Sequence, residues 1–162
     1  MIAREIMQRD VVTAQPGMTL KELAALLVDH QITGAPVVNA AGLLVGVVSQ
    51  TDLVRHDREE ADRPKPAGSF YSDEFYKPGM WPRQAHETRV RDCMTPLVLS
   101  ASRSDDVLDL ARMMLEHRVH RMIISEGGKL YGIVTTMDLV RALVDLHEEK
   151  RRARPARKGR KS

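Results

Sequence analysis

One stretch of this 162-residue chain occurs twice. The run VVSQTDLVRH at 47–56 aligns with IVTTMDLVRA at 133–142, and LLVDHQITGAPVV at 26–38 aligns with MMLEHRVHRMIIS at 113–125. The offset is 87 residues in the early part and 86 in the late part, so a short gap near residue 41 joins the two alignments. Each unit has roughly 55 residues, too few to bury a good core alone. We therefore expect two copies of one small unit that pack against each other.

Both units predict the same order of elements: strand, helix, strand, strand, helix. Thr19 and Glu22 form a capping box before apolar residues at helical spacing, and Asp106 is the corresponding N-cap in the second copy. The final helices begin near Thr51 and Met137. The strands are expected at 11–14, 35–38 and 43–49 in the first copy, and at 97–101, 122–125 and 130–135 in the second. The fold class is therefore mixed α/β (α+β), with two βαββα repeats.

The segments outside the repeats differ sharply in composition. We place the first domain at 2–56, an insert at 57–88, the second domain at 89–146 and a basic disordered tail at 147–162. The insert opens charged and Pro-rich, as a linker does. It then carries five of the six aromatic residues of the chain, namely Phe70, Tyr71, Phe75, Tyr76 and Trp81. Disordered linkers are poor in aromatics, so we expect it to dock on the globule or on a partner subunit, either as a surface cover or as a lid on the cleft.

Charge is distributed unevenly along the chain. Eight of the 25 basic residues lie in Lys150–Ser162, which has no acidic residue, so the remainder carries 17 basic and 22 acidic residues. The tail is expected either to be a solubilising segment or to bind nucleic acid weakly and in a salt-dependent way, which its deletion would distinguish. The single cysteine and the absence of an apolar stretch long enough for a signal peptide or a membrane span favour a cytoplasmic protein with no membrane insertion.

A hydroxyl and a carboxylate recur at the junction between a buried strand and a helix. The pairs are Ser49 with Asp52 and Thr135 with Asp138. Backbone N–H groups at a helix N-terminus and a nearby hydroxyl suit a phosphate, whereas the carboxylate suits the diol of a ribose. Simple helix capping by the same residues is the alternative interpretation.

The start of the second hairpin carries a cationic pair. His120 and Arg121 can contact a phosphate, unless they are only a solvated pair in a loop. In the first copy, Gly34 and Pro36 shape a backbone that a flat ring could approach closely.

These motifs, in order and twice, resemble a pair of CBS domains, named after cystathionine β-synthase. The resemblance rests on HQITGAPVV, GVVSQTDLVRH and GIVTTMDLVRA and covers nearly everything except the insert and the tail. It implies two repeats packed pseudo-symmetrically through their sheets, with adenosine ligands bound in the clefts between them. It also implies a regulatory role in signal transduction and further association into a homodimer.

The resemblance assigns roles to individual residues. The hydroxyls would contact phosphate and the aspartates would hold the ribose, while the His-Arg pair would add phosphate contacts and the first-strand residues would contact the base. The expected nucleotide-binding residues are Thr13, Gly34, Ala35, Pro36, Ser49, Thr51, Asp52, Ser100, His120, Arg121, Thr135 and Asp138. Because Arg121 and Ile123 replace Gly34 and Pro36 in the second copy, we expect one good site and one weak site. The expected ligand is AMP, ADP or ATP rather than S-adenosylmethionine, and no cofactor is required.

Two other functions are weighed against nucleotide sensing. An enzyme is disfavoured because the sequence has no metal-ligand cluster and no Gly-rich phosphate loop. His30 and His117 fit helix C-termini, and Cys93 occupies an apolar position of the repeat. A ligand-free interaction module stays open, since a stand-alone CBS pair passes its signal to an effector protein that the sequence does not identify.

Overall fold

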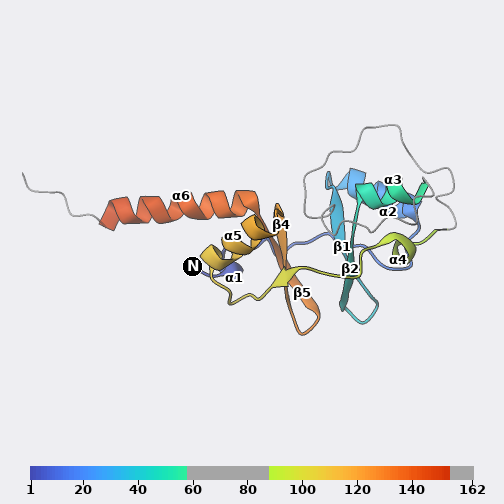
Figure 1. Cartoon of the computed structure of the whole chain (residues 1–162), viewed down its shortest axis with the longest axis horizontal. Coiled ribbons are helices and arrows are strands. Elements are labelled where there is room, and N and C mark those ends of the chain that lie inside the picture. The colour runs from blue at the N-terminus through green and yellow to red at the C-terminus, as the bar shows by residue number, and fades with distance from the viewer. Residues whose placement is uncertain (58–87, 154–162) are drawn as a thin grey trace, which may run out of the picture.

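Helices flank two small sheets in this structure, a computed structural model that describes residues 1–57 and 88–153. The strands lie in the middle of the molecule, and the helices of the two repeats lie at its two ends (Figure 1). The elements are α1 (Ala3–Ile6), α2 (Leu20–Asp29), β1 (Gly34–Val38), β2 (Leu44–Ser49), α3 (Gln50–Asp57), α4 (Val90–Cys93), β3 (Ser100–Ala101), α5 (Val107–Glu116), β4 (Arg121–Glu126), β5 (Lys129–Thr135) and α6 (Thr136–Ala153). The predicted mixed α/β class with two repeats is confirmed.

Helices α2 and α5 begin where their capping residues predict. The Thr19 hydroxyl accepts the Glu22 N–H at 3.2 Å, and the Glu22 carboxylate accepts the Thr19 N–H at 2.8 Å. Asp106 accepts the N–H of Leu108 at 2.8 Å in the second copy. These bonds satisfy backbone donors that the first helical turn leaves without partners. The capping box and the Asp106 cap are therefore confirmed.

The register of the two hairpins fixes the position of the candidate residues. In the antiparallel pair β1–β2, Gly34 lies opposite Ser49. In β4–β5, Arg121 lies opposite Thr135. In each hairpin, the first residue of the first strand therefore lies beside the hydroxyl residue, Ser49 or Thr135, that directly precedes the next helix. The two repeats present the same arrangement at equivalent places.

The first strand of each repeat is much shorter than predicted. Only Ala14 of the expected strand 11–14 pairs with the hairpin, through a parallel bridge to Val37. In the second copy, β3 comprises only Ser100–Ala101 of the expected 97–101, and Leu97 is 73% exposed. The chain turns at residues 9–11 instead, where the Val11 N–H donates to the Arg9 carbonyl at 3.1 Å. The apolar pattern was interpreted as extended pairing along the whole segment, and that interpretation is wrong.

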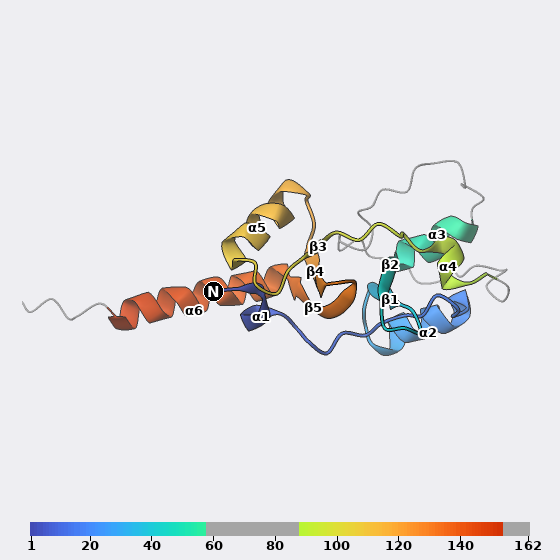
Figure 2. The same ribbon diagram turned by 90° about the horizontal axis from the view of Figure 1, so that it is seen from below.

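The short helix that precedes each repeat packs on the other repeat, as Figure 2 shows for α1 beside α5 and α6. The N–H of Ala3 donates to the Asp105 carbonyl at 2.9 Å, and α1 contributes to the core of the second repeat. Reciprocally, Val90 and Cys93 of α4 are buried in the core of the first repeat. Cys93 is therefore the buried apolar residue that its repeat position predicts, at 2% exposure. Each core is completed by the other copy, which is how units this small bury enough apolar surface.

Two glycines permit this exchange. A Cβ on Gly132 would lie 2.7 Å from the Gln8 carbonyl oxygen, and one on Gly46 would lie 2.8 Å from the Thr95 carbonyl oxygen. Gln8 and Thr95 follow α1 and α4, and each exchanges two backbone hydrogen bonds with the second hairpin strand of the opposite repeat. The glycines are needed because the two backbones approach so closely.

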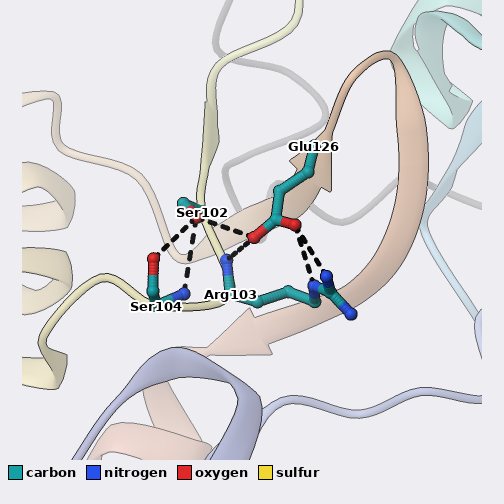
Figure 3. Close-up of polar contacts among 4 residues, drawn as sticks. All are labelled: Ser102, Arg103, Ser104 and Glu126. Carbon is teal, nitrogen blue, oxygen red and sulfur yellow. Dashed lines mark hydrogen bonds and ion pairs between the residues drawn. The ribbon is translucent and has the colours of Figure 1, made fainter.

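The loop between β3 and α5 is held by Glu126, at the end of β4 (Figure 3). Its carboxylate accepts the Ser102 hydroxyl at 2.8 Å, the Arg103 N–H at 3.1 Å and two guanidinium N–H groups of Arg103 at 3.0 and 2.8 Å. The Arg103 guanidinium also stacks over Tyr131, 3.9 Å from the ring centroid. The side-chain hydrogen bonds from Arg103 and Ser102 lower the pKa of Glu126 to about 2.

The tail begins later than predicted. Helix α6 continues to Ala153, so the boundary at 147 is wrong for the first seven residues of the segment. Residues 147–153 are mostly strong helix formers, and Arg152 pairs with Glu148 one turn earlier at 3.5 Å. Residues 154–162 and the aromatic part of the insert lie outside the described residues, so the expectations for the tail and for insert docking stay predictions.

Candidate functional site

The two hydroxyl–carboxylate pairs have closely similar geometry. Asp52 accepts the N–H of Ser49 at 2.8 Å and its hydroxyl at 3.0 Å. Asp138 accepts the N–H of Thr135 at 2.8 Å and its hydroxyl at 2.7 Å. Both carboxylates are almost completely buried. The capping interpretation is therefore correct for one carboxylate oxygen of each pair, and a ligand role has to be compatible with it.

Asp138 has an additional partner from the N-terminal segment. The side-chain amide nitrogen of Gln8 donates to its two carboxylate oxygens, at 3.2 and 3.1 Å. The guanidinium of Arg141 lies 3.7 Å from the same carboxylate. Gln8 is held in place by backbone hydrogen bonds with Ile133, at 2.8 and 3.0 Å. The amide therefore occupies hydrogen-bonding positions on both carboxylate oxygens of Asp138.

The cationic residue of the second hairpin reaches the first repeat. The Arg121 guanidinium donates to the Thr33 hydroxyl at 3.1 Å. The residues next to it follow the repeat symmetry, because the Thr33 carbonyl accepts the Gln50 N–H at 2.9 Å and the His120 carbonyl accepts the Thr136 N–H at 3.0 Å. Arg121 thus places a positive charge where the polar ends of the two hairpins adjoin.

The remaining predicted residues surround these groups. Gly34, Ala35 and Pro36 are buried at the start of β1, and the Pro36 carbonyl accepts the N–H of Ala14 at 2.9 Å. Thr13 directly precedes Ala14 and is half-buried.

Three more predicted residues, Ser100, Thr51 and His120, lie beside the hairpins or at the start of the helix that follows. Ser100 pairs with Ile123 in the parallel bridge of β3 with β4. Thr51 is half-buried in the first turn of α3, and His120 is exposed just before β4. The structure therefore gathers the predicted residues into two groups, one around each hairpin.

These two groups offer hydrogen-bonding and charged side chains that suit a polar, anionic ligand. Each group offers a hydroxyl, a carboxylate and backbone groups, and Arg121 adds a charge suited to an anion. Within residues 1–57 and 88–153, no three His, Cys, Asp or Glu side chains lie close enough together to hold a metal ion. Across the same ranges, no helix combines the length and the apolar character that a membrane crossing requires.

Sequence reasoning missed three residues of this region: Gln8, Thr33 and Thr95. The repeat alignment sets Gln8 opposite Thr95, so the sequence already shows that the two copies differ at this position. The exchange of α1 and α4 between repeats was not expected. Without it, nothing brings Gln8 to Asp138, which is 130 positions away in the chain.

Several known proteins are similar to this chain. An uncharacterized protein of Methanocaldococcus jannaschii is 30% identical over 158 residues, which cover 89% of this chain and 92% of that protein. The chloroplastic CBS domain-containing protein CBSX1 of Arabidopsis thaliana is 30% identical over 146 residues, and the match covers 86% of this chain but only 61% of CBSX1.

The fold also matches solved structures. The crystal structure of CBSX2 in complex with AMP superposes with a TM-score of 0.67 at 26% sequence identity, covering 90% of this chain and 98% of that one. A putative acetoin utilization protein (AcuB) of Vibrio cholerae, with a TM-score of 0.72 and 22% identity over 96% of this chain and 98% of that one, shares the fold.

The family model named CBS domain matches residues 3–59 and 90–145, which are the two repeats found from the sequence. The chain belongs to the CBS domain family.

Proposed function

We propose that this chain is a regulatory module that binds an adenine nucleotide between its two CBS repeats. The observation that carries the proposal is that each repeat places a hydroxyl–carboxylate pair at the start of its last helix, while Arg121 of the second repeat reaches Thr33 of the first. The complex of CBSX2 with AMP, at 26% identity over most of the chain, supports the same class of ligand. The CBS family consists of regulatory modules in general, which favours binding without catalysis.

Different residues are proposed to bind the phosphate, the ribose and the base of the nucleotide. Arg121 and the exposed His120 supply donors to phosphate oxygens, and the N-termini of α3 and α6 add favourable partial charge. Asp52 and Asp138 accept hydrogen bonds from ribose hydroxyls. The buried start of β1 at Gly34 and Pro36 provides an apolar surface for the base.

The exchange of α1 and α4 gives a physical route to regulation. The segment that follows each short helix reaches the opposite repeat, so each ligand region is built from both copies. A nucleotide there interacts with both repeats at once, and it can shift their arrangement only by binding one arrangement more tightly. A change in that arrangement would be transmitted to an effector protein. We also propose that the chain acts as a homodimer.

Isothermal titration calorimetry with AMP, ADP and ATP tests the nucleotide proposal. We expect saturable binding of at least one of them, with unequal affinities for the two regions. Replacing Asp52 or Asp138 with asparagine keeps a capping acceptor but removes the charge that holds the ribose. A charge-assisted hydrogen bond is worth about 1.5–3 kcal/mol, so the affinity of the altered region should fall roughly 10- to 100-fold.

The matched control is Asp109→Asn, which makes the same chemical change on the exposed surface of α5, where Asp109 pairs with Arg112 at 2.8 Å. It should leave nucleotide affinity unchanged. Far-UV circular dichroism verifies that all three variants fold. The proposal is wrong if AMP, ADP, ATP and S-adenosylmethionine all give no saturable heat with the folded protein.

A further inference from the structure

Helix α6 carries an exposed row of apolar side chains along one side. Met137, Val140 and Val144 follow one another at intervals of three and four residues, which places them on the same side of a helix. Leu143 adjoins them, and Met137 and Leu143 are each 67% exposed. We call these four residues the α6 stripe.

Basic residues continue this stripe toward the C-terminal end of the helix. Lys150 and Arg151 follow the last two residues of the stripe by seven positions each. Seven positions are about two helical turns, so both basic residues lie on the side that carries the stripe. Both are exposed. This side of α6 therefore changes from apolar to cationic along its length.

The acidic residues of this part of α6 do not offset that cationic group. Asp145 and Glu149 fall on the opposite side of the helix at this spacing. Glu148 forms an ion pair with Arg152 at 3.5 Å. Beyond α6, residues 154–162 add five basic residues and no acidic residue. The positive charge that begins on the stripe side thus continues in the chain past the end of the helix.

Helix α5 widens the apolar surface beside the stripe. Leu115 is 79% exposed and lines, together with Leu143 and Leu108, an apolar groove between α5 and α6. Helix α6 extends past α1 and α5, at the end of the molecule opposite α2 and α3 (Figures 1 and 2). The apolar and the cationic surfaces therefore lie together at one end of the molecule.

The first repeat shows that the fold does not require this surface. The repeat alignment places Thr51 opposite Met137 and Asp57 opposite Leu143. The same fold in the same chain thus accepts polar or charged residues at these positions. Contiguous exposed apolar surface marks an interaction site, so this end of the molecule has a partner.

We propose that this surface binds the face of an anionic lipid bilayer. A helix that lies in a membrane interface places its apolar side chains at the boundary of the acyl chains and its basic side chains among the headgroups. The α6 stripe supplies the first group, and Lys150, Arg151 and the basic residues after Ala153 supply the second. Helix α6 would lie along the bilayer surface without crossing it.

The combination of the two surfaces selects this partner over others. A nucleic acid would engage only the basic residues, because its binding rests on phosphate charge. An uncharged apolar partner would engage only the stripe. An anionic bilayer is complementary to both, and anionic lipids attract clusters of basic residues on an amphipathic helix.

Co-sedimentation of the full chain with vesicles, in the absence of nucleotide, tests this proposal independently of the proposed ligand. The vesicles consist of phosphatidylcholine alone or with about 40% phosphatidylglycerol, which makes their surface anionic. We expect binding to the anionic vesicles and little binding to phosphatidylcholine alone. Raising NaCl from about 0.1 M to about 1 M should weaken the binding, because salt screens the headgroup charge.

Two pairs of matched variants separate the cationic from the apolar contribution. Lys150→Glu should weaken binding about 25-fold, since each basic charge near an anionic surface contributes roughly fivefold. Lys21→Glu makes the same change on α2 and should have no effect. Leu143→Asp should weaken binding roughly tenfold or more, because an apolar contact with the bilayer is lost. Val28→Asp, at a 57% exposed position of α2, is its control.

Far-UV circular dichroism verifies that the four variants fold. A chain that does not bind the anionic vesicles overturns the proposal. So does vesicle binding that Leu143→Asp leaves unchanged, which would make the basic residues a general site for polyanions. If the chain stays off the vesicles and sedimentation equilibrium shows a dimer that Leu143→Asp dissociates, a second copy covers the stripe and the proposal is wrong.

Discussion

Replacing Gln8 with threonine is expected to strengthen nucleotide binding at Asp138 and to lower the free energy of unfolding of the protein. The Gln8 amide donates to both carboxylate oxygens of Asp138. A ribose that binds this carboxylate has to displace the amide first. The free energy of that hydrogen bond is therefore subtracted from the binding free energy of the ligand.

The magnitude follows from the geometry. The two contacts share one nitrogen and are long, at 3.2 and 3.1 Å, so their combined net contribution lies near about 1 kcal/mol. Threonine is the natural replacement, because Thr95 occupies the equivalent position beside the first hairpin, where it exchanges backbone hydrogen bonds with Val47 at 2.8 and 2.9 Å. Its side chain is too short to span the same gap. We expect about fivefold tighter binding and a free energy of unfolding lower by about 1 kcal/mol.

The assay is calorimetry with AMP in an Asp52→Asn background, which isolates the second region, together with urea unfolding in the absence of ligand. The reciprocal change, Thr95→Gln in an Asp138→Asn background, should bring an amide near Asp52 and weaken binding there. If Gln8→Thr instead lowers the affinity at Asp138, Gln8 contacts the ligand directly and the displacement argument is refuted.

Two further predictions concern stability. The pKa of Glu126 in the folded protein is about 2, below the ordinary value of 4.5, so its contribution is complete above pH 4.5 and is lost as the pH falls toward 2. The melting temperature of the wild type should therefore fall more steeply over this range than that of Glu126→Gln, which has lost the ion pair with Arg103; parallel curves would show that the pair contributes nothing. Gly132→Ala should cost about 1–3 kcal/mol in urea unfolding, because the new Cβ meets a backbone oxygen at 2.7 Å. Gly17→Ala, where no atom lies within 4 Å, is its control, and equal effects of the two would contradict the close-approach argument.

The parts of the fold that the sequence predicted are those with a strong local signal. The Thr19 and Asp106 caps and the two hairpins were found because capping residues and apolar runs act within a few positions of the chain. The pairs Ser49–Asp52 and Thr135–Asp138 were found because the same two residue types recur at the same spacing in both copies. Duplication also predicted the mutual dependence of the two copies.

The parts that were missed depend on distant contacts or on weak local patterns. Helices α1 and α4 have four residues each, too few for a helical period to show. The C-terminal turns of α6 have almost no apolar residues, so propensity and charge pairs sustain them without a periodic pattern. The contact between Gln8 and Asp138 depends on which repeat α1 joins, and tertiary packing decides that.

The same exchange brings the N-terminal segment into contact with both Asp138 and the groove between α5 and α6. Gln8 lies at one end of this segment, where its amide donates to Asp138, and Met1 lies at the other end, where it lines an apolar groove between α5 and α6. Between them, α1 is tied to the second repeat by the hydrogen bond from Ala3 to Asp105. A ligand that displaces the Gln8 amide therefore perturbs a segment that also lines this groove. Since coupling free energies are reciprocal, any change that a nucleotide makes in dimer affinity equals the change that dimerisation makes in nucleotide affinity.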